Sequence, residues 1–276
     1  MRKNKKSTKK IVQGMILNAT ILILSLVIII PLLIVVFNSF KDSYEASKFE
    51  LTLPTTFNFD NYIEVFNTSN IFQAMGNGAI YAISTCLVVI LFASSAAFIV
   101  QRRKNIILYR VFIFGLVLPL SMIPTITLGQ MLGIYGTRFN LVMIYSATSI
   151  PFCFFMYYNF ISTIARELDE ASIVDGAKTL QLYFQIILPL LKPVTFTLIL
   201  ITATNIWNDF YWQLYFTNRA TLWGMPMTVY QYFGLYSRSW NLVAANIIIA
   251  VLPVLILFIA FQKQIVEGMT AGAVKG

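Results

Sequence analysis

The chain has 276 residues, of which 58% are apolar and 11% are charged. A soluble domain is usually about 45–50% apolar and about 25% charged, so the composition excludes an ordinary soluble protein and predicts lipid as the solvent. The formal net charge of +9 does not indicate nucleic-acid binding, because six of the twenty basic residues lie in the first ten positions, beside an apolar run.

The first predicted element is a membrane span that follows a basic N-terminal segment, 1–13. Residues 11–40 contain no charge for thirty positions, which is longer than the apolar region of a signal peptide. No Ala-x-Ala cleavage site follows this run. We therefore expect a retained span.

Six segments are apolar enough for helices that cross a bilayer, which need about 20 residues each. They are residues 14–38, 76–100, 111–134, 141–163, 193–216 and 244–262. The pattern predicts an all-α polytopic membrane protein whose six-helix domain covers residues 14–262. Prolines in the first, third and sixth segments are either ordinary kinks or flexing points; they are Pro31, Pro119, Pro124 and Pro253.

The basic residues predict the orientation of these spans. If the N-terminus is inside, the cytoplasmic segments carry fifteen of the twenty Lys and Arg; these segments are 1–13, 101–110, 164–192 and 263–276. Basic residues concentrate on the cytoplasmic side of membrane proteins. We therefore expect both termini in the cytoplasm and a multi-pass protein in the cell membrane. The external segment at 41–75 is expected to contain one short helix near Tyr62.

The residue types needed for catalysis, metal binding and nucleotide binding are scarce. The chain has no histidine, and Cys86 and Cys153 lie in apolar stretches without a metal or disulfide spacing. The run at 176–179 resembles only a fragment of a phosphate-binding loop. We expect no catalytic residue, metal site or cofactor, and any nucleotide to be bound by another chain.

The segment at 164–192 carries six charges within thirteen residues before it becomes apolar. Its acids are expected in the first turn of a short helix, where carboxylates favour the positive end of the helix dipole. Gly176 is expected to turn the chain with positive φ, and Thr179 to cap a second short helix. That helix would face the bundle with residues at helical spacing, Leu180, Tyr183, Phe184, Ile187 and Leu188. From the residues alone, the segment is either a docking surface or a plain cytoplasmic connector.

This segment also resembles the coupling-loop signature of ABC importer permeases. The matching residues are Glu170, Ala171, Ser172, Gly176, Ile186, Leu188 and Pro189. Asp175-Gly176-Ala177 is similar to the sugar-importer branch, and the chain end at 267–276 is similar to that of maltose-type permeases. Further similar positions are Asn61-Tyr62, Asn77, Pro151-Phe152 and 207–210, so the likeness covers nearly the whole chain.

Three positions depart from the family pattern. Ser172 stands where the family has Ala, Ala165 where a proline is usual, and Gln213 where the fifth span usually has Trp-Pro. The first is a change between small residues. Gln213 would indicate a different substrate contact.

The resemblance implies a non-enzymatic permease subunit of a carbohydrate ABC importer. It implies partners: a second, homologous permease in a heterodimer, two ATPase subunits, an extracytoplasmic sugar-binding protein and the sugar. The implied ATPase-coupling residues are Glu170, Ala171, Ser172, Asp175, Gly176, Ala177, Ile186, Leu188 and Pro189. The implied contacts from the tail at 263–276 are Gly272, Lys275 and Gly276. We call residues 164–192 the coupling loop.

The fifth predicted span carries the one charge found in any span, Asp209. Ionisable residues inside a span usually face the bundle interior or water, and aromatic and amide side chains suit sugar rings. The predicted substrate-pathway residues are Asn205, Trp207, Asn208, Asp209, Tyr211, Trp212 and Gln213. The alternative interpretation is an aromatic belt at the outer interface, with the companion permease holding most sugar contacts.

Three other functions stay open from the sequence. An ABC permease for a non-sugar solute would fit the coupling loop but not the chain end. A secondary transporter or channel would leave the loop spacing unexplained. An intramembrane enzyme would need paired ionisable groups at membrane depth, and only Asp209 is present.

Overall fold

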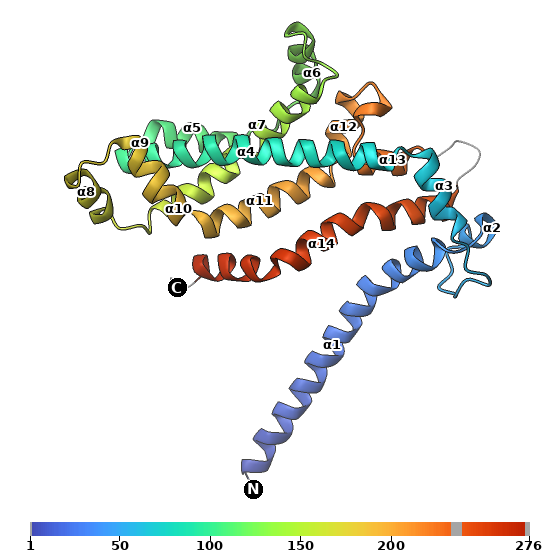
Figure 1. The fold of residues 1–276 in the computed structure, drawn as a ribbon. Coiled ribbons are helices and arrows are strands. Elements are labelled where there is room, and N and C mark those ends of the chain that lie inside the picture. Colours follow the sequence, from blue (N-terminus) through green and yellow to red (C-terminus); the bar gives the residue numbers. More distant parts are fainter. Residues whose placement is uncertain (1, 233–238, 274–276) are drawn as a thin grey trace. The chain divides into compact units, whose positions relative to one another are not determined.

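The computed structural model describes residues 2–232 and 239–273, with side chains for 14–232 and 239–261. Within these residues the regular elements are all helical, which confirms the predicted all-α class (Figure 1). The chain divides into two compact units, Met1–Ser69 with Val229–Val251 and Asn70–Thr228 with Leu252–Gly276. The candidate sites lie in the second unit.

The first unit contains three whole helices, α1 (Arg2–Asn38), α2 (Ser43–Ala46) and α3 (Asp60–Thr68), with the end of α13 (Met225–Tyr230) and the start of α14 (Trp240–Ala273). The most apolar 18-residue stretch of Gly14–Asn38 in α1 has a mean hydropathy of 3.2, and none of its residues is buried. A helix that is apolar on all sides suits lipid. Helix α3 confirms the short helix predicted near Tyr62.

Lys41 of the first unit is fully buried, although the sequence places it in an external loop. Its Nζ donates to the carbonyl of Glu50 at 3.0 Å and to Oγ1 of Thr52 at 3.1 Å. Asn61, also buried, donates from Nδ2 to the carbonyls of Ser39 and Lys41. A buried ammonium is unfavourable unless it is hydrogen-bonded. The segment after α1 therefore has to fold so that it supplies these partners to Lys41, and this gives it a defined structure.

The second unit holds the following elements: α4 (Ile71–Arg103), α5 (Ile106–Val117), α6 (Met122–Met131), α7 (Arg138–Ile161), α8 (Glu167–Val174), α9 (Thr179–Gln181), η1 (Leu182–Ile187), α10 (Leu188–Leu190), α11 (Lys192–Trp207), α12 (Tyr211–Phe216) and η2 (Ala220–Leu222). Helix α13 (Met225–Tyr230) and helix α14 each continue from one unit into the other. Helices α4, α7 and α11 pack together, and α5 lies against α7 (Figure 1).

The two faces of α4 explain how this unit is held in lipid. Its buried face carries small side chains such as Ala93 and Ala97, which allow the close helix contacts typical of membrane bundles. Phe154 of α7 completes the core by stacking on Phe112 of α5, with ring centroids 4.0 Å apart. The opposite face of α4 exposes large apolar side chains; Phe92 is 63% exposed. Lipid is the solvent that such a face suits.

Among the residues that the structure describes, four helices are long and apolar enough to span a membrane, and there are up to six candidate spans if two bent pairs each count as one. One bent pair is α5 with α6, which meet at 112° on either side of Pro119, one of the prolines at which the sequence predicts a kink or a flexing point. The other is residues Thr179–Leu190 with α11, which meet at 72°. Pro31 and Pro253 lie inside continuous helices.

One predicted span was wrong. The fifth span, predicted at 193–216, is not one helix, because α11 ends at Trp207 and α12 begins at Tyr211. The sixth span, predicted at 244–262, lies within α14, which begins at Trp240 and continues beyond the span to Ala273. Gly272 therefore lies in α14, whereas Lys275 and Gly276 lie outside the described residues.

Candidate functional site

The first arm of the coupling loop is helix α8. Its first turn contains Glu167, Asp169 and Glu170, as the sequence predicts. Glu170 and Ala171 are exposed, and Ser172 turns its hydroxyl back to the carbonyl of Leu168 at 2.6 Å. The first three residues of the family signature, Glu170, Ala171 and Ser172, therefore lie on a helix none of whose side chains is buried.

Gly176 forms the elbow of the loop, with a φ of +85° that confirms the prediction. The amide of Ala177 donates to the carbonyl of Ser172 at 2.9 Å, and that of Gly176 to the carbonyl of Ile173 at 3.0 Å. This pair of hydrogen bonds is the Schellman pattern that closes many helices. A Cβ at Gly176 would meet no atom within 4 Å, so the requirement for glycine comes from φ and not from crowding.

The second arm runs through α9, η1 and α10. It begins at Thr179, but the loop amide of Lys178 is held by Oε1 of Gln181 at 2.8 Å, so the prediction that Thr179 caps this arm was wrong. The next six residues, η1, form a π-helical turn, a feature that often lies at functional sites. Pro189 lies in α10 and is exposed.

The apolar side chains of this arm divide between the core and the surface. Tyr183 and Ile187 are buried, and Ile186 and Leu188 pack on the same core cluster. Leu180 and Phe184 are 70% and 51% exposed. The prediction that all five residues of the second helix face the bundle was therefore wrong for Leu180 and Phe184, since the π-helical turn and the three-residue helix before it do not keep one apolar stripe.

An arginine from outside the loop fixes the first arm to α4. Nε of Arg102 lies 2.6 Å from Oδ2 of Asp169, and Nη2 donates to Oδ1 at 3.0 Å. The two side chains are 11% and 13% exposed. The sequence analysis did not identify this pair, because 67 residues separate its members.

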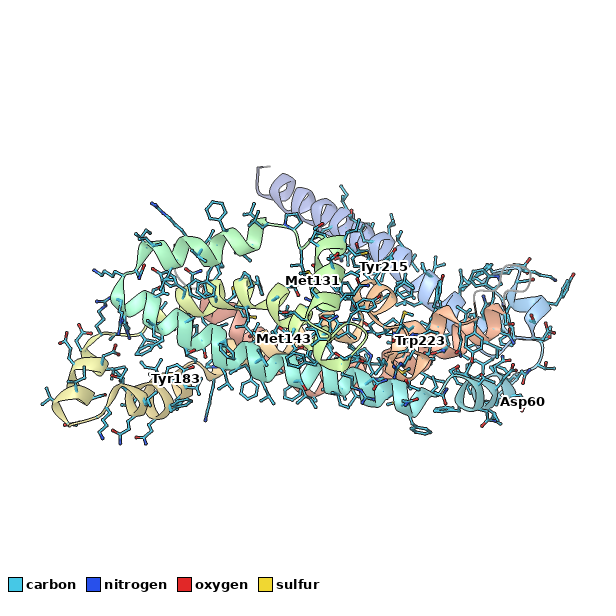
Figure 2. The ribbon with its side chains drawn as sticks, turned by 90° about the horizontal axis from the view of Figure 1, so that it is seen from above. Asp60, Met131, Met143, Tyr183, Tyr215 and Trp223 are labelled. Carbon is cyan, nitrogen blue, oxygen red and sulfur yellow. The ribbon has the colours of Figure 1, made fainter. Side chains whose placement is uncertain are left out.

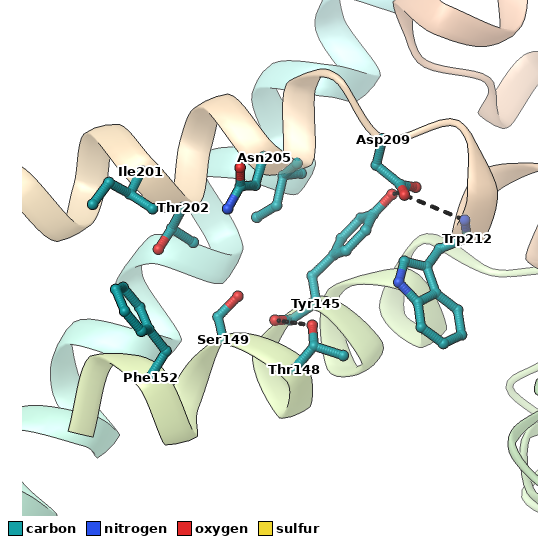
Figure 3. Close-up of a pocket in the computed structure, with 10 residues that line it drawn as sticks. Tyr145, Thr148, Ser149, Phe152, Ile201, Thr202, Asn205, Asp209 and Trp212 are labelled. Atoms are coloured by element: carbon teal, nitrogen blue, oxygen red, sulfur yellow. Dashed lines mark hydrogen bonds between the residues drawn. The ribbon is translucent and has the colours of Figure 1, made fainter. Parts of the chain in front are cut away.

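A second candidate site is a cavity of about 380 Å³ within the second unit (Figure 3). Its lining comes from α7, from α11, from the turn after α11 and from α12: Tyr145, Thr148, Ser149, Phe152, Ile201, Thr202, Asn205, Ile206, Asp209 and Trp212. Hydroxyl, amide, carboxylate and aromatic groups thus surround one space. Such a set can hydrogen-bond and stack on a polar ring.

The structure brings three of the seven predicted pathway residues to this cavity, Asn205, Asp209 and Trp212. The other four do not line it; they are Trp207, Asn208, Tyr211 and Gln213. Trp207 instead lies against α4, where a Cβ on Gly78 would come within 3.1 Å of the indole ring. Gln213 is buried, with its Nε2 donating to the carbonyl of Asp209 and its Oε1 accepting from the amide of Gly224.

Sequence reasoning missed the wall that α7 contributes. The four residues are Tyr145, Thr148, Ser149 and Phe152. Their spacing of three, four and seven positions places them on one helix face. Two hydroxyl residues and a tyrosine on one face of an apolar span are the signal that could have indicated this wall.

Asp209 explains the break after α11. Its Oδ2 accepts from the Tyr145 hydroxyl at 2.8 Å and from the amide of Gln213 at 3.3 Å, and its Oδ1 accepts from the amide of Trp212 at 3.4 Å. The carboxylate therefore caps α12, since it satisfies amides at the start of that helix. It also connects α12 to α7 across the cavity (Figure 3).

Comparison with known proteins gives consistent matches. Residues 89–270 match the family described as binding-protein-dependent transport system inner membrane component. The chain is 33% identical to AmyC of Thermoanaerobacterium thermosulfurigenes, a probable starch degradation products transport permease, over 96% of this chain and 98% of that one. It is 32% identical to the Streptococcus mutans multiple sugar-binding transport permease MsmG, over 91% and 93% of the two chains.

Two further matches extend this result. MelC of Bacillus subtilis, a melibiose/raffinose/stachyose import permease, is 32% identical over 90% of this chain and 91% of its own. A solved bacterial ABC transporter that imports the acidic polysaccharide alginate contains a chain with a TM-score of 0.79 and 20% identity, over 91% of this chain and 96% of that one. The structural match shows that the fold is shared.

Proposed function

Because the chain belongs to the family of binding-protein-dependent transport system inner membrane components, we propose that it is the permease subunit of an ABC importer for a sugar or oligosaccharide. The observation that carries the proposal is the similarity to permeases named for starch products, multiple sugars and raffinose-type sugars. In each case the similarity extends over nine-tenths or more of both chains. The chain supplies a route for the solute, and a partner ATPase supplies the energy.

We assign ATPase docking to the coupling loop. Support comes from α8, which presents Glu170 and Ala171 together with exposed Ile173 and Val174, 61% and 86% accessible. Large exposed apolar side chains beside acids are typical of a surface that a partner covers. Gly176 sets the angle of this surface, while the second arm continues into the core. The other coupling residues keep the roles that the family pattern implies, and the chain end from Gly272 contributes to the same interface.

We assign the solute route to the cavity between α7 and α11. The members of the pathway then are Asn205, Asp209 and Trp212, joined by Tyr145. Neutral hydroxyl and amide groups with aromatic rings suit a sugar, which offers many hydroxyls and an apolar ring face. The importer would be completed by a second permease, two ATPase subunits and an external binding protein. In support, a solved bacterial alginate ABC transporter, one chain of which matches this one with a TM-score of 0.52 and 18% identity, is in complex with an alginate pentasaccharide-bound periplasmic protein.

The test of this function is purification of the tagged chain with its native partners in mild detergent, followed by reconstitution. We expect an ATPase and a sugar-binding protein to remain attached. We also expect ATP-dependent uptake of a labelled maltodextrin or raffinose-type sugar into the vesicles. Uptake that persists without ATP would identify a secondary transporter. A complex without an ATPase would contradict the proposal.

Our topology prediction is that residues 1–13, the coupling loop and the segment 263–276 are cytoplasmic, with residues 14–262 forming the transmembrane domain. Single cysteines at Lys48, Lys178 and Arg219 test it on a background without Cys86 and Cys153. A membrane-impermeant thiol reagent should label positions 48 and 219 in intact cells and position 178 only after lysis. Labelling of position 178 in intact cells would reverse the orientation.

A further inference from the structure

Both arms of the coupling loop contact the same face of α4. Ser94, Phe98 and Arg102 follow one another at intervals of four residues, which places them on one side of that helix. Ser94 Oγ and the hydroxyl of Tyr183 lie 2.6 Å apart, and the ring of Tyr183 lies 5.6 Å from that of Phe98. Arg102 contacts the first arm, α8, through Asp169. Figure 2 shows Tyr183 close to this end of α4.

The contact through Arg102 has the geometry of a specific positioning device. The guanidinium donates one hydrogen bond to Asp169, from Nη2 to Oδ1, while Nε lies close to Oδ2 as an ion pair without the alignment of a hydrogen bond. Nη1 also donates to the carbonyl of Ile164 at 3.3 Å, just before α8. Hydrogen bonds from two nitrogens of one planar guanidinium, to a carboxylate and to a backbone carbonyl, restrict orientation as well as distance. Because both side chains are largely shielded from water, salt screens this pair less than a surface pair.

Helix α8 has few other contacts that orient it. It has eight residues, and none of its side chains is buried. A helix of this length is not stable alone in water. Besides the ion pair, Nη2 of Arg166 donates to the carbonyl of Gln101 at 3.3 Å, also at the end of α4. Helix α8 also lies against η1 of the second arm. Its direction therefore depends on that packing together with the polar contacts to the last turn of α4.

The other end of α4, near Asn77, is also held by specific hydrogen bonds. Nδ2 of Asn77 donates to the carbonyls of Thr221 and Trp223, both at 2.9 Å, and the hydroxyl of Tyr81 donates to the carbonyl of Leu222 at 2.7 Å. From residue 77 to residue 102 the helix rises by roughly 37 Å. Figure 2 shows Tyr183 and Trp223 towards opposite ends of this unit. One continuous helix thus joins the coupling loop to the segment at 221–223.

We infer that Arg102 and Asp169 are a positioning pair that makes α8 and α4 move as one body, so that α4 is the helix that ATPase docking displaces. The inference rests on the proposed function, in which α8 meets the ATPase. A displaced α8 carries Arg102 with it, and α4 transmits the movement to residues 221–223. Without the pair, the ATPase stays bound to α8 but no longer moves the transport route.

The test uses the complete importer in proteoliposomes with Arg102→Asp, Asp169→Arg and the double exchange. Each single change should lower sugar uptake by about tenfold, which is within the measured range of coupling for paired charges, and the double exchange should restore most of it. ATPase retention should stay normal, while the ATP hydrolysed per sugar rises in the single variants. Arg103→Asp is the matched control. It makes the same change of charge in the same turn of α4, but at a side chain that is exposed.

Spin labels at positions 103 and 173, on the cysteine-free background, give a second measurement that does not depend on transport. The distance distribution should broaden in Asp169→Asn and narrow again in the double exchange. Equal widths in all variants, or single variants that transport like the wild type, would overturn the inference. A wild-type complex that neither retains an ATPase nor takes up sugar would instead contradict the proposed function.

Discussion

Gly176→Val is expected to abolish sugar uptake while the chain still inserts into the membrane. Gly176 has a φ of +85°, and a residue with a Cβ costs about 1–2 kcal/mol there, with more for a β-branched side chain. The Cβ itself would meet open space, so the strain is relieved by a change in backbone direction. That change redirects α8 relative to the second arm, and the docking surface no longer fits its partner. Uptake and the amount of ATPase retained on the purified complex measure the effect.

Gly133 offers a control with the same local structure. It has a φ of +68° and no atom within 4 Å of a Cβ, and the amides of Gly133 and Ile134 close the end of α6 on Gln130 and Gly129. This is the same Schellman pattern that Gly176 forms. Gly133→Val should therefore strain the backbone equally but retain the ATPase. Gly176→Asn should keep part of the uptake, because asparagine tolerates the left-handed region. Normal transport and full retention in Gly176→Val would mean that the loop is a plain connector.

The elbow could be predicted from sequence because its physics is local. A glycine after a short acidic helix is favoured at the position that needs positive φ, and no distant residue decides this. The exposure of Leu180 and Phe184 could not be predicted in the same way. Their side chains face outwards because the arm changes to a π-helical turn, and that turn is held by the contact between Tyr183 and Ser94, 89 residues earlier in the chain.

The cavity shows the same limit at a longer range. Sequence could mark Asp209 as unusual, since it is the one charge in the predicted spans, and the structure places it at the cavity. It could not reveal that Tyr145, 64 residues earlier, reaches the same carboxylate. The sequence also could not show that Asn205 lines the cavity while Trp207 does not. That difference depends on the direction in which each side chain leaves α11. Both the contact of Tyr145 with Asp209 and the direction of Asn205 depend on how the helices pack. The hydrophobic pattern of the sequence does not contain that information.

The second large effect is expected for Asp209→Ala, which should lower uptake at limiting sugar by about tenfold or more. The change removes the acceptor for Tyr145, Trp212 and Gln213, and hydrogen bonds to a charged group each contribute about 1.5–3 kcal/mol. Helix α12 then loses its cap, and the cavity loses the carboxylate that connects its two walls. Membrane level and ATPase retention should stay near wild type, because Asp209 lies outside the coupling loop.

Two tyrosines distinguish the cavity from the general stability of this region. Tyr145→Phe removes the hydroxyl that Asp209 accepts, whereas Tyr135→Phe removes a hydroxyl that donates to the carbonyl of Tyr215 at 2.8 Å, and Tyr135 does not line the cavity. We expect the first to raise the sugar concentration needed for half-maximal uptake and the second to leave it unchanged. If Asp209→Ala and Tyr145→Phe both transport normally at limiting sugar, Asp209 and its neighbours form an aromatic belt at the membrane surface. The route for the solute would then lie on the companion permease.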